Sequence, residues 1–352
     1  MMRLATVSLS QTQKTKFVTM PKTVDFTLPV NEAKKVVEKV LRMKGCDKEN
    51  ARAVTDVMIR VEIDGCVFHG LFRLPGYIAS LESGKVNGSA RPDIKHLLPS
   101  VLRVDGNGGF APLVLEEVRP VLIQAAQTHG IVAASLINTH HFAALWCEVE
   151  PLAEAGLCAL ACTNYLPAVA PFGGRRPFFG TNPMAFGWPR EGKPPFVFDQ
   201  ASAAMARGDL MLAAKANETV PDGIGLDQNG QQTTDPSEIL NGGVMLPFGR
   251  HKGSSIAIMV ELLTAGLCGA PFSHEAAAAD NGDGGPPKGG EFILAIDPSK
   301  FGDPNWLAHS DSFFEELSGL HGVRLPGSRR HTRRGETDMI TFSLAQDLAR
   351  EL

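Results

Sequence analysis

The stretch Gly106-Asn-Gly-Gly-Phe-Ala111 decides the fold class of this chain. It fits the G-x-G-x-x-G/A fingerprint of dinucleotide-binding βαβ units, follows a predicted strand over Ser100–Val104 and precedes a predicted helix over Leu113–His129. The acidic residue that such a unit places about 20 positions later is absent, because the next strand reads Ile131-Val-Ala-Ala-Ser-Leu136. No βαβ array continues beyond it. We therefore interpret the glycines as a tight turn and exclude a Rossmann fold.

The sequence before this stretch has helical periodicity, so we expect the first folded segment to be a helix. Asn31 is its candidate N-cap, apolar residues follow at 3,4 spacing, and Gly45 suits the C-terminus. Asp47 is a candidate cap for a second helix, and a third is predicted over Leu74–Leu81.

From about residue 131 the pattern changes to short apolar runs separated by Gly, Pro and Asn, which is typical of strands joined by functional loops. A long apolar helix over Ser254–Leu267, a Gly/Pro loop over Asp280–Gly290 and a short helix over Asp311–Leu320 complete the chain. The pattern predicts an α+β fold. The predicted strands are Ile131–Leu136, Leu157–Cys162, Met184–Gly187, Phe196–Phe198 and Phe292–Ile296.

Composition narrows the class of protein. A length of 352 residues predicts about two domains. The net charge of −4 argues against a nucleic-acid partner, and no run of about 18 apolar residues predicts a membrane span. The N-terminus lacks the apolar core of a secretory signal, and Met20 is a second candidate start. Six cysteines without a CxxC pair indicate reduced thiols in a cytoplasmic protein, with Cys158 and Cys162 in the core.

A first chemical motif joins His69 to Arg73. A histidine supplies a titratable proton donor, and an arginine fork binds a carboxylate in two-pronged fashion, which would orient a small acid. The other interpretation is a surface histidine at a helix start, with Arg73 in a salt bridge. The pattern alone favours neither.

Two loops have the composition of anion sites. His140 and His141 follow a strand, but neighbouring histidines rarely bind one metal ion and no HExxH pattern or nearby carboxylate completes a zinc set, so we predict no metal. The small residues after them better suit a helix start that admits phosphate or ribose. The stretch 246–254 places Gly, Arg250, His251 and Lys252 at a helix start, although it does not fit a Walker A loop.

Polar groups elsewhere leave alternatives open. Gly-Thr-Asn-Pro at residues 180–183 places a hydroxyl at a strand end. Asp199 and Asp209 could each orient a catalytic histidine or cap a helix. Residues 324–334 contain five arginines in eleven positions, which suits a solvated face. A serine followed by Arg329 and Arg330 also suits a 2′-phosphate, which would favour NADP over NAD.

Five motifs occur together in one order. Their combination resembles the malate/L-lactate/L-sulfolactate dehydrogenase family, which is NAD(P)-dependent and has no Rossmann fold. The resemblance extends from Asn31 to the C-terminus, and the tail Arg-Leu-Pro-Gly-Ser-Arg-Arg is most similar to the Δ1-piperideine-2-carboxylate/Δ1-pyrroline-2-carboxylate reductase branch. The motifs are His-Gly-x-x-Arg-x-Pro-x-Tyr (69–77), His-His-Phe-Ala-Ala (140–144), Phe-Gly-Thr-Asn-Pro (179–183), Asp-x-Ala-Ser (199–202) and Leu-Pro-Phe-Gly-x-His-Lys-Gly (246–253).

The resemblance implies a homodimer with two domains in each chain. A helical, substrate-binding domain would comprise residues 24–130 with 305–352, so that it takes both chain ends. Residues 131–304 would form an NADP-binding domain on a mostly antiparallel sheet.

The resemblance also implies roles for individual residues. His69 would be the proton donor and Asp209 a polar neighbour of the reacting centre, while Arg73 and Thr181 would bind the substrate. NADPH contacts would fall on His141, Phe142, Ala143, Ala144, Leu145, Asp199, Gln200, Ala201, His251, Lys252, Arg324, Leu325, Pro326, Gly327, Ser328, Arg329 and Arg330.

The reaction that the resemblance implies is NADPH-dependent reduction of a cyclic 2-imino acid, giving L-pipecolate or L-proline. The rivals are a 2-hydroxy acid dehydrogenase of the malate, lactate or ureidoglycolate type and a non-catalytic NADP-binding paralogue. Two departures from the family pattern bear on this. Phe68 replaces a serine that relays protons, and Arg250 replaces the second glycine of a Gly-Gly pair.

Overall fold

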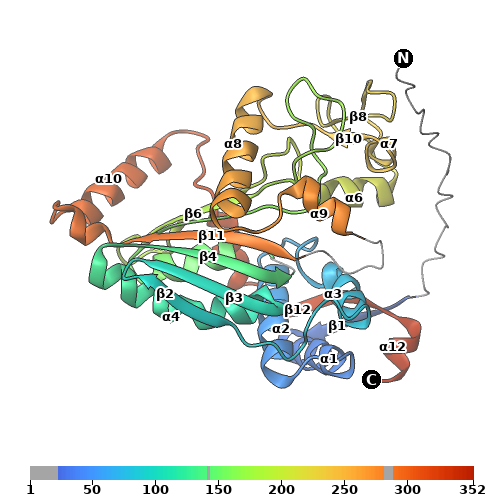
Figure 1. Cartoon of the computed structure of the whole chain (residues 1–352), viewed down its shortest axis with the longest axis horizontal. Coiled ribbons are helices and arrows are strands. Elements are labelled where there is room, and N and C mark those ends of the chain that lie inside the picture. The colour runs from blue at the N-terminus through green and yellow to red at the C-terminus, as the bar shows by residue number, and fades with distance from the viewer. Residues whose placement is uncertain (1–22, 141–142, 281–287) are drawn as a thin grey trace, which may run out of the picture.

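The computed structural model describes residues 23–140, 143–280 and 288–352. Its centre is a seven-stranded sheet in the order β2-β3-β4-β11-β5-β6-β7 (Figure 1). Within the described ranges β3 and β4 pair in parallel and the other neighbours pair antiparallel. The predicted α+β fold on a mostly antiparallel sheet is therefore confirmed. The strands are β2 (Asp93–Leu98), β3 (Val101–Phe110), β4 (Ile131–His140), β5 (Cys158–Thr163), β6 (Met184–Trp188), β7 (Phe196–Gln200) and β11 (Gly289–Ile296).

The glycine stretch lies inside β3, so the expected tight turn is wrong. The register between β3 and β4 shifts there, and Asn107 and Gly108 adopt left-handed backbone with φ of 50° and 75°. This is a bulge, which re-aims a strand without ending it. Gly106 also allows close approach of the two strands, because an added Cβ would lie 2.2 Å from Cγ2 of Thr139. These glycines serve strand packing.

Helices cover both faces of the sheet (Figure 1). On one face, α4 (Ala111–His129) and α5 (Trp146–Glu154) pack on inward residues such as Val104 and Leu136, which are fully buried. On the other face lies α8 (His251–Glu261), whose Val260 is buried against the sheet. Successive side chains of a strand point to opposite faces, and apolar side chains on both faces give the sheet two apolar faces.

The first and the last strand of the described chain lie side by side at the lower right of Figure 1. There β1 (Thr23–Pro29) pairs antiparallel with β12 (Met339–Ala345), beside α1 (Val30–Met43) and α2 (Lys48–Ile63). The expectation that a helix comes first is therefore wrong. Pro29, not Asn31, occupies the N-cap of α1, because strand β1 runs directly into the helix. The division into domains stays a prediction.

Other expected elements differ mainly at their ends. Asp47 caps α2 as predicted, with Oδ1 accepting from the backbone N–H of Asn50 at 2.9 Å. The expected helix over Ser254–Leu267 begins earlier, at His251, and its last six residues form a π-helical turn, η2 (Leu262–Leu267). The predicted loop over residues 280–290 lies mostly outside the described residues.

The remaining elements surround the sheet. All six cysteines are free thiols, and Cys158 and Cys162 are buried in β5 as expected. No helix in the described ranges is long and apolar enough to cross a membrane. The other elements are η1 (Leu71–Arg73), α3 (Leu74–Glu82), α6 (Arg207–Ala216), β8 (Gly225–Leu226), β9 (Gln232–Thr233), α7 (Pro236–Leu240), β10 (Val244–Met245), α9 (Ser273–Ala279), η3 (Pro298–Phe301), α10 (Trp306–Gly319), α11 (Ser328–Arg334) and α12 (Gln346–Arg350).

Candidate functional site

A cavity of about 540 Å³ brings several predicted site residues together. They come from segments far apart in the chain: the loop after α2, η1, the residue range before β6 and the end of β7. A concave site with a few convergent polar groups is the usual setting for binding a small molecule. The predicted site residues that line it are His69, Arg73, Ala143, Thr181, Asp199, Gln200 and Ala201.

His69 is half-buried beside a fixed positive charge. Burial lowers the pKa of His69 to about 4, and Arg73 lowers it in the same direction. The imidazole is therefore neutral at pH 7 in the ligand-free protein. Of the two interpretations left open by the sequence, a surface histidine does not describe this environment.

Phe68 connects the His69 loop to α6. Its ring centroid lies 4.7 Å from that of His69. On the other side it packs against Gly208, where an added Cβ would come within 2.5 Å of the ring. A phenyl ring has no group that relays protons. The side chain that replaces the relay serine thus packs between two walls of the cavity.

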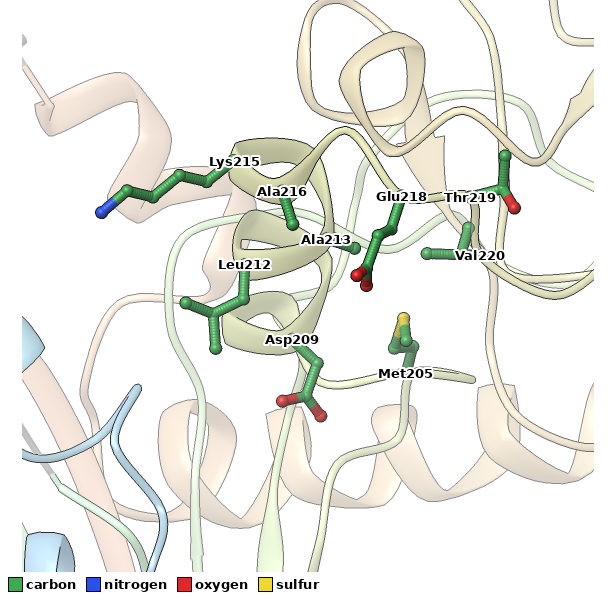
Figure 2. Close-up of a pocket in the computed structure, with 9 residues that line it drawn as sticks. All are labelled: Met205, Asp209, Leu212, Ala213, Lys215, Ala216, Glu218, Thr219 and Val220. Atoms are coloured by element: carbon green, nitrogen blue, oxygen red, sulfur yellow. The ribbon is translucent and has the colours of Figure 1, made fainter.

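Asp209 lies outside the lining of this cavity. It follows Arg207 by two residues, which turns it about 200° around the axis of α6. Arg207, Gly208 and Met211 face the cavity, whereas Asp209 lines a separate surface pocket. Figure 2 shows its carboxylate on the side of α6 where Met205 lies. Burial raises the pKa of Asp209. Its part in the reaction stays a prediction.

Asp199 caps a helix, which was one of its two open interpretations. Its Oδ2 accepts a hydrogen bond from the backbone N–H of Trp146, the first residue of α5, at 3.2 Å. Burial raises the pKa of Asp199 to about 6, and that backbone hydrogen bond opposes the shift. Ala144 and Leu145 are buried in the core behind the cavity. The predicted cofactor contacts His141 and Phe142 lie outside the described residues.

The arginine-rich tail packs through Arg330 on Trp146, a residue of the cavity lining. Its guanidinium lies 4.7 Å from the ring centroid of Trp146, which lines the cavity. The Nε of Arg330 is buried and has no hydrogen-bond partner among the described residues. Gly327 comes close to β7, since an added Cβ would lie 2.8 Å from the carbonyl oxygen of Val197. Arg324, Pro326 and Arg329 are exposed, and Leu325 and Ser328 are half-buried.

Arg334 anchors this tail to the cavity wall. It donates to both carboxylate oxygens of Asp64 at 2.6 and 2.7 Å, and to those of Glu150 at 2.9 and 2.8 Å. Asp64 Oδ2 also accepts from the indole N–H of Trp146 at 2.8 Å. The arginine run is visible in the sequence, but its two carboxylate partners are not. No local signal could have found them, because Asp64 lies 270 positions from Arg334.

The loop at the start of α8 neighbours the cavity without lining it. The N–H of Phe248 donates to the carbonyl of Ser202 at 3.0 Å, and the N–H of Ser202 donates to that of Thr181 at 2.7 Å. The side chains of His251 and Lys252 are exposed at the helix start. Ser202 directly follows the predicted cofactor segment 199–201. Its hydrogen bond with Phe248 therefore links that segment to the loop that carries the second predicted segment, 251–252.

These residues fit a phosphate-bearing cofactor. Arg330 keeps a buried donor atom without a partner among the described residues, and an anionic oxygen would satisfy it. The exposed cations of the α8 loop and of the tail add positive charge nearby. The binding roles of these residues stay predictions.

Comparison with known proteins places the chain in a family. The model of the malate/L-lactate dehydrogenase family matches residues 28–352, so the chain belongs to that family, whose dehydrogenases use a nicotinamide cofactor. It is 46% identical to a Δ1-pyrroline-2-carboxylate reductase of Ancylobacter novellus, over 82% of this chain and 86% of that protein. It is 41% identical to a (2R)-3-sulfolactate dehydrogenase (NADP+) of Chromohalobacter salexigens, over 88% and 92%.

A solved structure shows the same fold. The crystal structure of the Δ1-piperideine-2-carboxylate reductase from Pseudomonas syringae pv. tomato superimposes with a TM-score of 0.86 at 38% identity. The match covers 93% of this chain and 98% of that one. The resemblance inferred from the motifs is confirmed.

Arg250 carries backbone strain that glycine would not. It is the N-cap of α8 with φ 60° and ψ −116°, a conformation that L-residues rarely adopt. Its guanidinium lies 5.2 Å from the ring centroid of Phe172, a contact that offsets part of the strain.

We therefore expect Arg250→Gly to be more stable than Arg250→Ala by about 1–2 kcal/mol, because both lose the contact with Phe172 and only glycine relieves the strain. Urea unfolding of the two variants measures this difference. Equal stability, or a more stable alanine variant, would show that the backbone at residue 250 is unstrained.

Proposed function

We propose that this protein reduces cyclic 2-imino acids, converting Δ1-pyrroline-2-carboxylate to L-proline and Δ1-piperideine-2-carboxylate to L-pipecolate. The observation that carries the proposal is the placement of His69 and Arg73 on one cavity in a chain 46% identical to a Δ1-pyrroline-2-carboxylate reductase. The cavity pairs a group that handles protons with a cation that binds a carboxylate, as an imino acid requires.

In this proposal Arg73 binds the substrate carboxylate through its two-pronged fork, and the Thr181 hydroxyl contacts the same substrate. When bound, the reduced nicotinamide supplies a hydride to C2 of the imine. The protein orients C2 and the ring nitrogen for that transfer, which is where positioning lowers the barrier most.

His69 supplies the proton that the ring nitrogen needs. Burial and then Arg73 lower the pKa of His69, and a carboxylate bound to Arg73 offsets the second of these effects and so raises the pKa. Substrate binding thus favours protonation of His69, whose proton passes to the ring nitrogen as C2 is reduced. The imine, one hydride and one proton give the secondary amine.

An NADPH oxidation assay tests the proposed reaction. Δ1-Pyrroline-2-carboxylate and Δ1-piperideine-2-carboxylate are compared with pyruvate and oxaloacetate on one preparation. We expect kcat/KM for at least one cyclic imine to exceed that for both keto acids. Faster reduction of a keto acid would favour the 2-hydroxy acid dehydrogenase, and no turnover with NADPH still bound would favour the non-catalytic paralogue.

His69→Ala should lower kcat by about 10²–10⁴-fold, the usual contribution of a positioned acid. NADPH affinity should stay nearly unchanged, because only the proton transfer is lost. Fluorescence titration with NADPH serves as the control. Full activity of this variant would exclude His69 as the proton donor.

The NADPH preference rests on Arg329 and Arg330, together with the Nε of Arg330, which has no hydrogen-bond partner within the described ranges. We propose that Arg330 binds the 2′-phosphate, and we expect Arg330→Ala to weaken NADPH binding by about 10-fold or more, with little change in NADH affinity. Equal affinity of the unaltered protein for NADPH and NADH would refute this preference.

The homodimer and the cytoplasmic location stay predictions. The six free thiols support a reducing compartment. An apolar groove lined by Trp306, Phe313 and Phe314 of α10 gives the chain a surface that a second copy could cover.

A further inference from the structure

A second arginine faces the same cavity as Arg73. Arg207 is the first residue of α6, and it lines the cavity together with His69, Arg73 and Tyr165. The two arginines come from different parts of the fold. Arg73 is the last residue of η1, and strands β2 to β7 lie between it and α6 in the sequence. No sequence motif predicts a role for Arg207.

The positive charge of this pair is not offset by a neighbouring carboxylate. Burial and then Arg73 lower the pKa of Arg207, and the phenol of Tyr165 raises it; among the described residues no carboxylate contributes to that shift. The same two causes act on His69. For Tyr165, burial and Asp280 raise the pKa, while Arg73 and Arg207 lower it. All four groups therefore share one positively charged end of the cavity.

The two acidic residues that line the cavity have other neighbours, although Asp280 also acts on Tyr165. Asp199 accepts from the N–H of Trp146 at 3.2 Å, and Asp280 lies 4.0 Å from Lys85. Two like charges that share a cavity raise the free energy of the ligand-free protein, and an anion bound between them lowers it. The arrangement thus calls for an anionic ligand at this end.

We propose that Arg207 is a second substrate-binding residue, which together with Arg73 holds the carboxylate of the substrate. This inference rests on the proposed function and extends it. Two guanidinium groups approaching from different elements fix both the position and the plane of one carboxylate. For a ring that carries this carboxylate on C2, the plane of the reacting C=N bond is then fixed as well.

Binding of furan-2-carboxylate tests the inference without turnover. It has a planar five-membered ring with one carboxylate. Furan-2-carboxamide has the same ring without the charge and is the matched ligand control. Isothermal titration compares the unaltered protein with Arg207→Ala, Arg207→Lys and Arg176→Ala, whose arginine is exposed and lies outside the cavity.

We expect Arg207→Ala to raise the Kd of furan-2-carboxylate by about 10- to 100-fold, the usual loss for a hydrogen-bonded charge. Arg207→Lys should fall between it and the unaltered protein, because lysine keeps the charge without the fork. Arg176→Ala should change the Kd of furan-2-carboxylate by less than about 2-fold. Arg207→Ala should change the Kd values of the carboxamide and of NADPH by less than about 2-fold. In the NADPH assay, Arg207→Ala should raise the KM of the imine more than it lowers kcat.

The inference is overturned if Arg207→Ala binds the carboxylate as tightly as the unaltered protein does, or if it loses affinity for the carboxamide equally. It is also overturned if Arg207→Ala raises the Kd only of dicarboxylates such as malonate, because Arg207 would then bind a second acidic group of the ligand. Failure of the proposed function looks different. The unaltered protein would then reduce no cyclic imine, while the titrations would still show whether Arg207 binds a carboxylate.

Discussion

Uncompensated positive charge beside a half-buried imidazole is the constraint on which the cavity depends. Arg73 lines it with His69, and Arg207 adds a second cation on which, in the described part of the chain, Tyr165 acts but no carboxylate does. Burial strengthens every interaction between these groups. The ligand-free protein therefore keeps His69 neutral, and a bound carboxylate changes both the charge of the cavity and the protonation of the imidazole.

The fold places these groups by contacts between distant segments. Phe68 packs against Gly208 and thereby holds the His69 loop on α6, which carries Arg207. Asp64 joins the indole of Trp146 to the arginine-rich tail through Arg334. A buried carboxylate with several charge-assisted hydrogen bonds specifies one arrangement, because any other arrangement leaves a charge unpaired. The C-terminal tail thus supports Trp146, which lines the cavity.

Much of the fold and of the site could be predicted because the signals are local. Neighbouring residues alone determine the apolar runs of the strands, the cap at Asp47 and the motif around His69. The pairing of β1 with β12 was missed because a short strand shows its nature only when its partner, at the other end of the chain, is present. Asp209 was expected near the reaction because of its motif, and that role stays a prediction; helix geometry places it outside the cavity lining, whereas Arg207, which had no predicted role, lies in it.

The protonation of His69 tests this account most directly. A histidine-selective NMR titration, with the His69 signal assigned by its loss in His69→Gln, gives the pKa of the imidazole with and without furan-2-carboxylate. The account predicts a pKa of about 4 in the ligand-free protein and a higher pKa when the carboxylate is bound. An ordinary pKa near 6.5 that does not change on binding would contradict it.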